Sequence, residues 1–255
     1  MSFNPITARF YEGSLTSQIN VDINTGQPNI TAAARINGMH TKDLWRDLNG
    51  GHPKISIETM GDMSFQVKTV GMNSSMLIRH MNGSGSIDFK QGVISGIDLK
   101  AVIESAYALI KKQPSNRSGN SDQSRFDSVS GNIAIRNGIL QSENLTLDSP
   151  DFSTLGNGRV DLPSQWINYI FHTRVKKAVS GRNNDWTNLY GIAIPIAVRG
   201  KLNDPAISLD AGQLLKAIAE KQLNAAGDDA KAQLKNKILE QVPGQAGELL
   251  NSLTR

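Results

Sequence analysis

The sequence contains no cysteine, and this absence removes several kinds of chemistry at once. Disulfide bonds, thiolate metal sites and thiol nucleophiles are all excluded. Cysteine-free chains occur in the cytoplasm as well as in the periplasm, so the absence does not fix the compartment.

Charge of one sign, aromatic side chains and long apolar runs are also scarce. The formal net charge is +4 and aromatic residues make up 5% of the chain. Nucleic-acid-binding surfaces usually show a basic stripe, so we expect no nucleic-acid partner. No stretch approaches the roughly 18 apolar residues of a transmembrane helix, and the first residues lack the order of a signal peptide. We therefore expect any export signal or anchor of an envelope protein to lie upstream of this sequence.

Alternation of apolar and polar residues is the main pattern from Met1 to about Asp210, and it is typical of β-strands. It is clearest in QINVDIN at 18–24 and in MSFQVKT at 63–69. Polar turn groups such as KLNDPA at 201–206 separate these runs. The pattern predicts a mainly β fold with helical additions, built on an extended antiparallel sheet.

One amphipathic helix is predicted inside this region, at about 98–112. Asp98 is its expected N-cap, and apolar residues at helical spacing follow it. Pro114 ends the pattern, and a polar, flexible loop is expected over about 113–125.

Two further helical regions are predicted. NSSMLIRHMNG at 73–83 reads as a short helix capped by Ser74 or Ser75 and ended at Gly83. After Asp210 the chain is rich in Ala, Leu, Lys and Gln, which predicts a helical tail over 211–255. The expected domains are therefore a β domain at 1–210 and this tail.

A short phrase ending in glycine recurs as YEG, KQG and RNG, at 11–13, 90–92 and 136–138. Asn-Gly between β-type runs is the strongest short hairpin signal, because both positions accept positive φ. We predict a hairpin at each copy. Two-residue turns would place in register the pairs Phe10–Leu15, Phe89–Ile94 and Ile135–Leu140. Three-residue turns with a bulge would instead give Phe89–Val93 and Ile135–Ile139, and both registers stay open.

No motif for catalysis or metal binding is present. The four histidines are not spaced as metal ligands, and no nucleophile elbow or complete phosphate loop occurs. The acidic residues are scattered, so no pair stands out as the carboxylates of a glycan-active enzyme. We expect no catalytic residue, no metal and no cofactor.

Four segments resemble, in the right order, the C-terminal part of the AsmA family of bacterial envelope proteins, which are related to TamB-like and other bridge-like lipid-transfer proteins. These segments begin with ITARFYEGSLTSQI at 6–19, MNGSGSIDFKQGVISGIDLKAVI at 81–103, FDSVSGNIAIRNGIL at 126–140 and IPIAVRGKLNDPAISLD at 194–210. The resemblance covers about 3–210. The family's usual N-terminal anchor and long preceding β region have no counterpart in this sequence.

The resemblance implies a curved β-groove with an apolar floor, in a non-enzymatic protein of envelope biogenesis. It implies phospholipid trafficking between membranes and outer-membrane homeostasis, with acyl chains as ligand and a periplasmic, inner-membrane-associated location. Two alternatives are an interaction module for outer-membrane protein assembly or targeting, with envelope proteins as partners, and a glycan-active enzyme. The candidate floor or core residues are Phe10, Leu15, Ile87, Phe89, Ile94, Ile133, Ile135 and Leu140.

Overall fold

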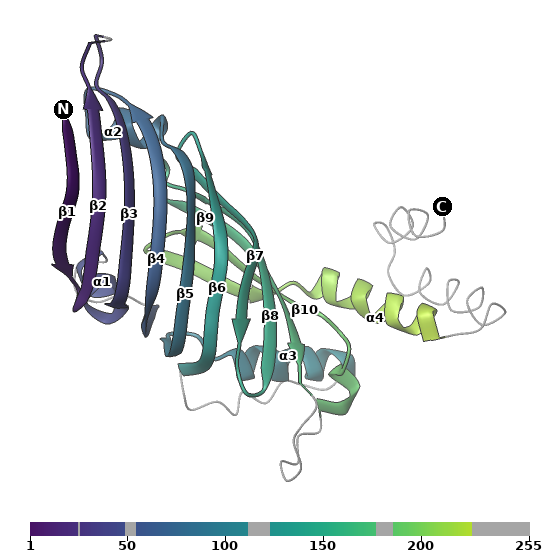
Figure 1. Cartoon of the computed structure of the whole chain (residues 1–255). Coiled ribbons are helices and arrows are strands. Elements are labelled where there is room, and N and C mark those ends of the chain that lie inside the picture. The colour runs from purple at the N-terminus through teal and green to yellow at the C-terminus, as the bar shows by residue number, and fades with distance from the viewer. Residues whose placement is uncertain (25, 49–54, 112–122, 177–185, 226–255) are drawn as a thin grey trace.

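The eleven strands of the described part of the chain form one antiparallel sheet, in which each strand pairs with its neighbours in the chain (Figure 1). The computed structural model describes residues 1–24, 26–48, 55–111, 123–176 and 186–225. The predicted extended antiparallel sheet is confirmed. Its strands are β1 (Ser2–Phe10), β2 (Gly13–Asp22), β3 (Asn29–His40), β4 (Ser56–Val70), β5 (Asn82–Ser95), β6 (Gln123–Arg136), β7 (Ile139–Asp148), β8 (Phe152–Asp161), β9 (Trp166–Val175), β10 (Ile194–Lys201) and β11 (Asp204–Leu209).

Four α-helices and one 3-10 helix accompany the sheet among the described residues. They are α1 (Thr41–Leu48), α2 (Ser74–Arg79), α3 (Leu99–Lys111), η1 (Trp186–Leu189) and α4 (Ala211–Ala225). The predicted helix at 98–112 is therefore α3. The Asp98 carboxylate accepts a hydrogen bond from the Ala101 backbone N–H at 3.0 Å, as expected of an N-cap.

Other helix predictions need correction. Helix α2 is capped by Asn73, whose side chain accepts from the Met76 N–H at 2.9 Å, and it ends at Arg79 rather than near Gly83. The tail prediction is met by α4 as far as residue 225, and 226–255 lie outside the described residues. The predicted loop spans about 113–125. Residues 113–122 lie outside the described residues, and residues 123–125 belong to β6.

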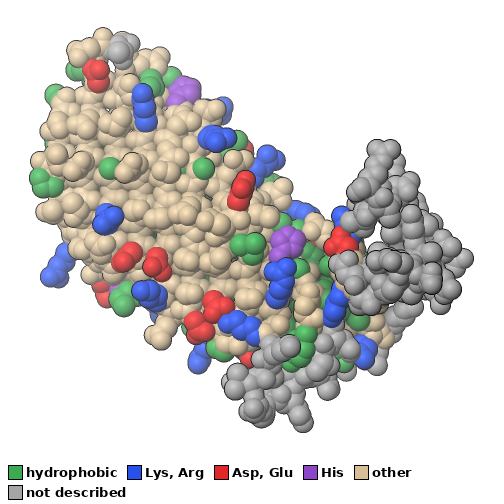
Figure 2. Space-filling view, turned by 45° about the vertical axis from the view of Figure 1, so that its right-hand side comes forward, with side chains coloured by type: hydrophobic (Ala, Val, Ile, Leu, Met, Phe, Trp, Pro, Cys, Tyr) green, Lys and Arg blue, Asp and Glu red, His purple; other side chains and the backbone are tan. Residues whose placement is uncertain are grey.

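The sheet is open and curved, and its two faces differ in chemistry. Figure 1 shows the last strands passing behind the first half of the sheet, on the side where α1 lies. The opposite face carries mainly exposed Ser, Thr, Asn and Gln side chains, and it fills much of Figure 2. We call these two sides the apolar face and the polar face; the apolar face lies inside the curve.

The Asn-Gly hairpin between β6 and β7 is confirmed. Asn137 and Gly138 have φ of 49° and 76°, and Ile135 pairs with Leu140, as the two-residue register requires. The three-residue register, which pairs Ile135 with Ile139, is wrong.

At the first copy the hairpin is present but the pair is different. Tyr11 and Glu12 form the turn with φ of 46° and 66°, so Phe10 pairs with Gly13 and Leu15 pairs with Ala8. The predicted Phe10–Leu15 pair is wrong because the glycine serves another purpose. A Cβ on Gly13 would lie 2.6 Å from the Asn37 carbonyl oxygen of β3.

The middle copy forms no hairpin. Strand β5 runs through it, with Gln91 at a φ of 50° in a bulge, and Phe89 pairs with Gly61 and Val129. Both predicted registers, Phe89–Ile94 and Phe89–Val93, are therefore wrong. A single residue with positive φ occurs in bulges as well as in turns. Only the pairing of β5 with β4 and β6 shows that Gln91 lies in a bulge and not in a hairpin turn.

Replacing Gly138 by alanine is expected to lower the free energy of unfolding by about 1–2 kcal/mol, because a side chain at positive φ is strained. Its Cβ would also meet the Ile78 carbonyl oxygen. Gly191→Ala is the matched control, since Gly191 has a φ of +79° but open space around it. Urea denaturation of both variants measures the difference, and equal losses would show that the Ile78 contact is unimportant.

Candidate functional site

The apolar face is built from rows of residues that pair directly across neighbouring strands. One row runs through the eight strands β2–β9, about 34 Å at the usual strand spacing of about 4.8 Å. Its members are Ile19, Ala32, Val67, Gly83, Ile135, Leu140, Val160 and Ile167. Every member is apolar or glycine, so the face is continuous along the sheet.

Two parallel rows lie beside it in the first half of the sheet. They consist of Ala8, Leu15, Ile36, Met63, Ile87 and Gly131, and of Ser17, Ala34, Phe65, Gly85 and Ile133. Ser17 is the single polar side chain among them. The alternation of each strand thus produces one broad apolar surface.

Helices cover this surface at three places. Leu44 of α1 packs with Ile36, Met39 and Phe89 near one end of the strands. At the other end, the Thr69 hydroxyl of β4 donates to the Leu77 carbonyl of α2 at 2.5 Å. Helix α3 lies over the C-terminal strands, where buried Ile103 and Ala106 join a cluster completed by Phe152, Val175, Trp186, Leu189, Ile192, Ile194, Ile196 and Leu214.

Between these covers a part of the face stays accessible. Ile19, Ala32, Val67 and Ile133 are half-buried and belong to neither apolar cluster. We call these four residues the open strip. Ile19, Ala32 and Val67 lie side by side on consecutive strands, and Ile133 lies two strands further on in the adjacent row. Half-buried aliphatic side chains within a curved sheet are suited to an elongated apolar ligand.

The structure brings most of the predicted floor residues onto this face. Leu15, Ile87, Ile133, Ile135 and Leu140 lie in the three rows. Phe10 and Phe89 pack in the cluster around Met39, with Phe89 only 9% exposed. Ile94, also 9% exposed, lies beyond the Gln91 bulge and pairs with Ile57. Phe89, Ile94 and Ile135 are thus buried, while Ile133 lies in the open strip.

Three residues of the open strip were not among the candidates. Ile19 and Val67 belong to the alternating segments QINVDIN and MSFQVKT, so alternation already placed each on an apolar strand face. Ala32 lies in TAAAR, where small residues hide the alternation. The three residues could be grouped only from the register between strands, which the sequence pattern does not show.

Titratable groups contribute little to the apolar face. Tyr169 is an ionisable side chain of this face in the C-terminal half, and its burial raises the pKa of the phenol. The phenol is therefore neutral around pH 7. Among the residues that the structure describes, no group of three or more His, Asp or Glu side chains could hold a metal ion.

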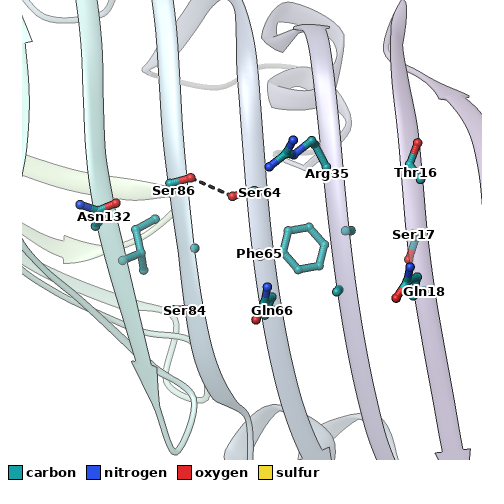
Figure 3. A pocket seen from close by; sticks show the side chains of 14 residues that line it. Thr16, Ser17, Gln18, Arg35, Ser64, Phe65, Gln66, Ser84, Ser86 and Asn132 are labelled. Atoms are coloured by element: carbon teal, nitrogen blue, oxygen red, sulfur yellow. Dashed lines mark hydrogen bonds between the residues drawn. The ribbon is translucent and has the colours of Figure 1, made fainter.

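A shallow hollow of about 740 Å³ crosses β2–β6, lined by polar-face residues and by the intervening row Ser17, Ala34, Phe65, Gly85 and Ile133. Figure 3 shows hydroxyl and amide side chains around it, and the Ser64 and Ser86 hydroxyls lie 2.8 Å apart in a hydrogen bond. Arg35 is the charged residue of the lining, which contains no carboxylate. A glycan-active enzyme would need two carboxylates there, so the hollow gives that alternative no support.

Comparisons with known proteins place this geometry in a family. Searches of curated proteins and of solved structures give no match. No helix in the described ranges is long and apolar enough to cross a membrane. The sequence model of the AsmA family matches residues 1–145, which run from β1 into β7 and include the whole open strip. This match covers more than half of the chain and associates it with the bacterial cell envelope. The chain belongs to the AsmA family.

Proposed function

We propose that the apolar face binds phospholipid acyl chains, and that the protein contributes without catalysis to lipid trafficking between the envelope membranes and to outer-membrane homeostasis. Its place would be periplasmic and associated with the inner membrane. The observation that carries the proposal is the open strip, an aliphatic surface left accessible between α1, α2 and α3.

The energetics of such binding need no special chemistry. Burial of an acyl chain yields about 0.8 kcal/mol for each methylene group, and this gain has no directional requirement. A row of aliphatic side chains can therefore hold a chain without a cofactor. The lack of polar anchors in the strip also suits a ligand that slides along the sheet.

Val67→Glu tests the proposal, because it places a carboxylate in the middle of the open strip. We expect the amount of phospholipid that co-purifies with the protein to fall at least about tenfold, since an acyl chain would then have to desolvate a charge. Native mass spectrometry of protein purified from bacterial membranes measures this amount.

Gln66→Glu is the matched control, because Gln66 is the adjacent residue of β4 and is exposed on the polar face. It should keep the bound lipid of the unmodified protein. Absence of phospholipid from the folded, unmodified protein would contradict the proposal, and so would equal loss in both variants.

A second candidate function is an interaction module that recruits envelope or outer-membrane assembly proteins by strand pairing. The observation in its favour is β1, an edge strand whose residues are mostly exposed. Exposed edges offer unpaired backbone groups to a partner strand. A photo-crosslinking residue in place of exposed Thr7 should then capture a protein, whereas one in place of Val67 should capture lipid if the first proposal holds.

A further inference from the structure

Two large apolar side chains are exposed close together where strands end. Ile23 is 62% and Met72 67% exposed. They follow β2 and β4, whose last residues, Asp22 and Val70, both pair with Asn29 of the intervening β3. The strand ends Asp22 and Val70, which these two residues follow, therefore lie about 10 Å apart, two strand spacings. We call this end of β2–β6, with α2 and the β6–β7 turn, the Ile23 rim.

Basic side chains lie at the same end of the sheet. Lys68, Arg79, His80 and Arg136 are all exposed on the Ile23 rim. Asp22 is the one acidic residue in 22–29, 68–82 and 135–139, and Asp161 of β8, which pairs with Ile139, lies next to the β6–β7 turn. Figure 2 shows basic and histidine side chains at this end of the molecule. The rim thus combines accessible apolar groups with a local excess of positive charge.

The segments that carry these charges are held to one another. The Asn82 side chain at the start of β5 accepts a hydrogen bond from the Asn137 N–H at 3.1 Å. The Gly138 N–H donates to the Met81 carbonyl at 2.9 Å. The β6–β7 turn and the end of α2 therefore form one surface rather than separate loops.

The opposite end of the same strands differs. We call it the Tyr11 rim; it comprises the β1–β2 turn, α1 and the adjoining end of β4. Lys42 pairs with Glu58, and Arg46 with Asp43 and Asp47, at shortest distances of 2.8–3.5 Å, and the His40 imidazole lies 3.6 Å from the Glu12 carboxylate. Most charge on that rim is paired within the protein, whereas Lys68, Arg79 and Arg136 of the Ile23 rim form no ion pair among the described residues.

We propose that the Ile23 rim docks the protein on the surface of a bilayer that contains anionic phospholipid. Ile23 and Met72 enter the interfacial region, while Lys68, Arg79 and Arg136 lie against the headgroups. The role of this contact rests on the proposed function: an acyl chain leaving the bilayer crosses this rim to reach the open strip. Val67 lies near the end of β4 that borders the Ile23 rim, four residues before Gly71.

Vesicle flotation tests the docking with the full chain. Vesicles of phosphatidylcholine alone are compared with vesicles containing about one phosphatidylglycerol for three phosphatidylcholines, because basic groups respond to surface charge. We expect binding to the anionic vesicles only. Removal of one basic group should weaken it about fivefold, and the double variant Arg79→Ser/Arg136→Ser about 25-fold. Ile23→Ser/Met72→Ser should weaken it about tenfold or more.

Matched controls come from the polar face. Met60→Ser removes a methionine that is 52% exposed, and Lys90→Ser removes an exposed lysine, both away from the Ile23 rim. These variants should bind vesicles like the unmodified protein. Docking is overturned if the unmodified protein floats with neither kind of vesicle, or if rim and control variants lose binding equally while their thermal midpoints are unchanged.

The same measurements separate docking from acyl-chain binding. Rim variants that lose vesicle binding but keep co-purified lipid support docking as a distinct step. If the unmodified protein holds no lipid yet the rim variants still lose vesicle binding, docking stands and the proposed function is overturned. Val67→Glu should keep vesicle binding, and its loss in a folded variant would overturn the assignment of docking to the Ile23 rim.

Discussion

Replacing Ile103 by alanine is expected to lower the free energy of unfolding by about 3–4 kcal/mol, because a fully buried Ile loses both transfer free energy and packing. Ile103 is 0% exposed and lies where α3 meets the sheet, η1 and α4. Its neighbours Leu189, Ile194 and Leu214 are also 0% exposed, so little room exists for the cluster to collapse into the cavity. Urea denaturation followed by far-UV circular dichroism gives the value.

Leu109→Ala is the control for this variant, since Leu109 lies on the same helix but is 40% exposed. It should cost less than about 1 kcal/mol. Equal small losses in both variants would mean that α3 does not seal the apolar face over β8–β10. The open strip would then extend into the C-terminal half of the sheet.

Thr173→Val is expected to cost about 2–3 kcal/mol, because it leaves the hydroxyl of Thr154 without its partner in a buried place. The two hydroxyl oxygens lie 3.0 Å apart, on residues that pair directly between β8 and β9. Thr173 is 0% and Thr154 8% exposed, so water cannot easily replace the lost bond. Valine keeps the β-branched shape, which isolates the effect of the hydroxyl.

The double variant Thr154→Val/Thr173→Val should recover most of this loss, since both polar groups are then gone. Thr146→Val is the exposed control: the Thr146 hydroxyl lies 3.0 Å from that of Ser130 on the surface. It should change stability by less than about 0.5 kcal/mol. A double variant less stable than Thr173→Val would contradict the explanation, because the hydroxyl pair would then contribute net stability.

Local chemistry predicted the parts of the fold that depend on neighbouring residues. Alternation predicted strands, Asn137-Gly138 predicted a turn with positive φ, and Asp98 predicted the start of α3. Each of these signals acts within a few residues, where conformational preference decides the structure. Helix α1 was missed because it is a short segment of eight residues between two strand patterns, although its sequence is amphipathic.

The predictions that were wrong concern places where pairing between distant segments decides the structure. The KQG phrase at 90–92 resembles the RNG phrase at 136–138, yet Gln91 forms a bulge in a strand that pairs on both sides. The same limit applies to the candidate site. Alternation identified Phe65 and Val67 as residues of one strand face, but only the register aligns Val67 with Ala32 and leaves both uncovered.

The strictly sequential strand order has a consequence for how such a protein folds and changes in length. Because every strand pairs only with the strand before and after it, the sheet resembles a one-dimensional array with nearest-neighbour coupling. Sheet contacts join strands that are consecutive in the chain, so each strand can add to any pair already formed. Inserting or deleting a hairpin would lengthen or shorten the apolar face without rearranging the remaining strands, so its reach can evolve two strands at a time.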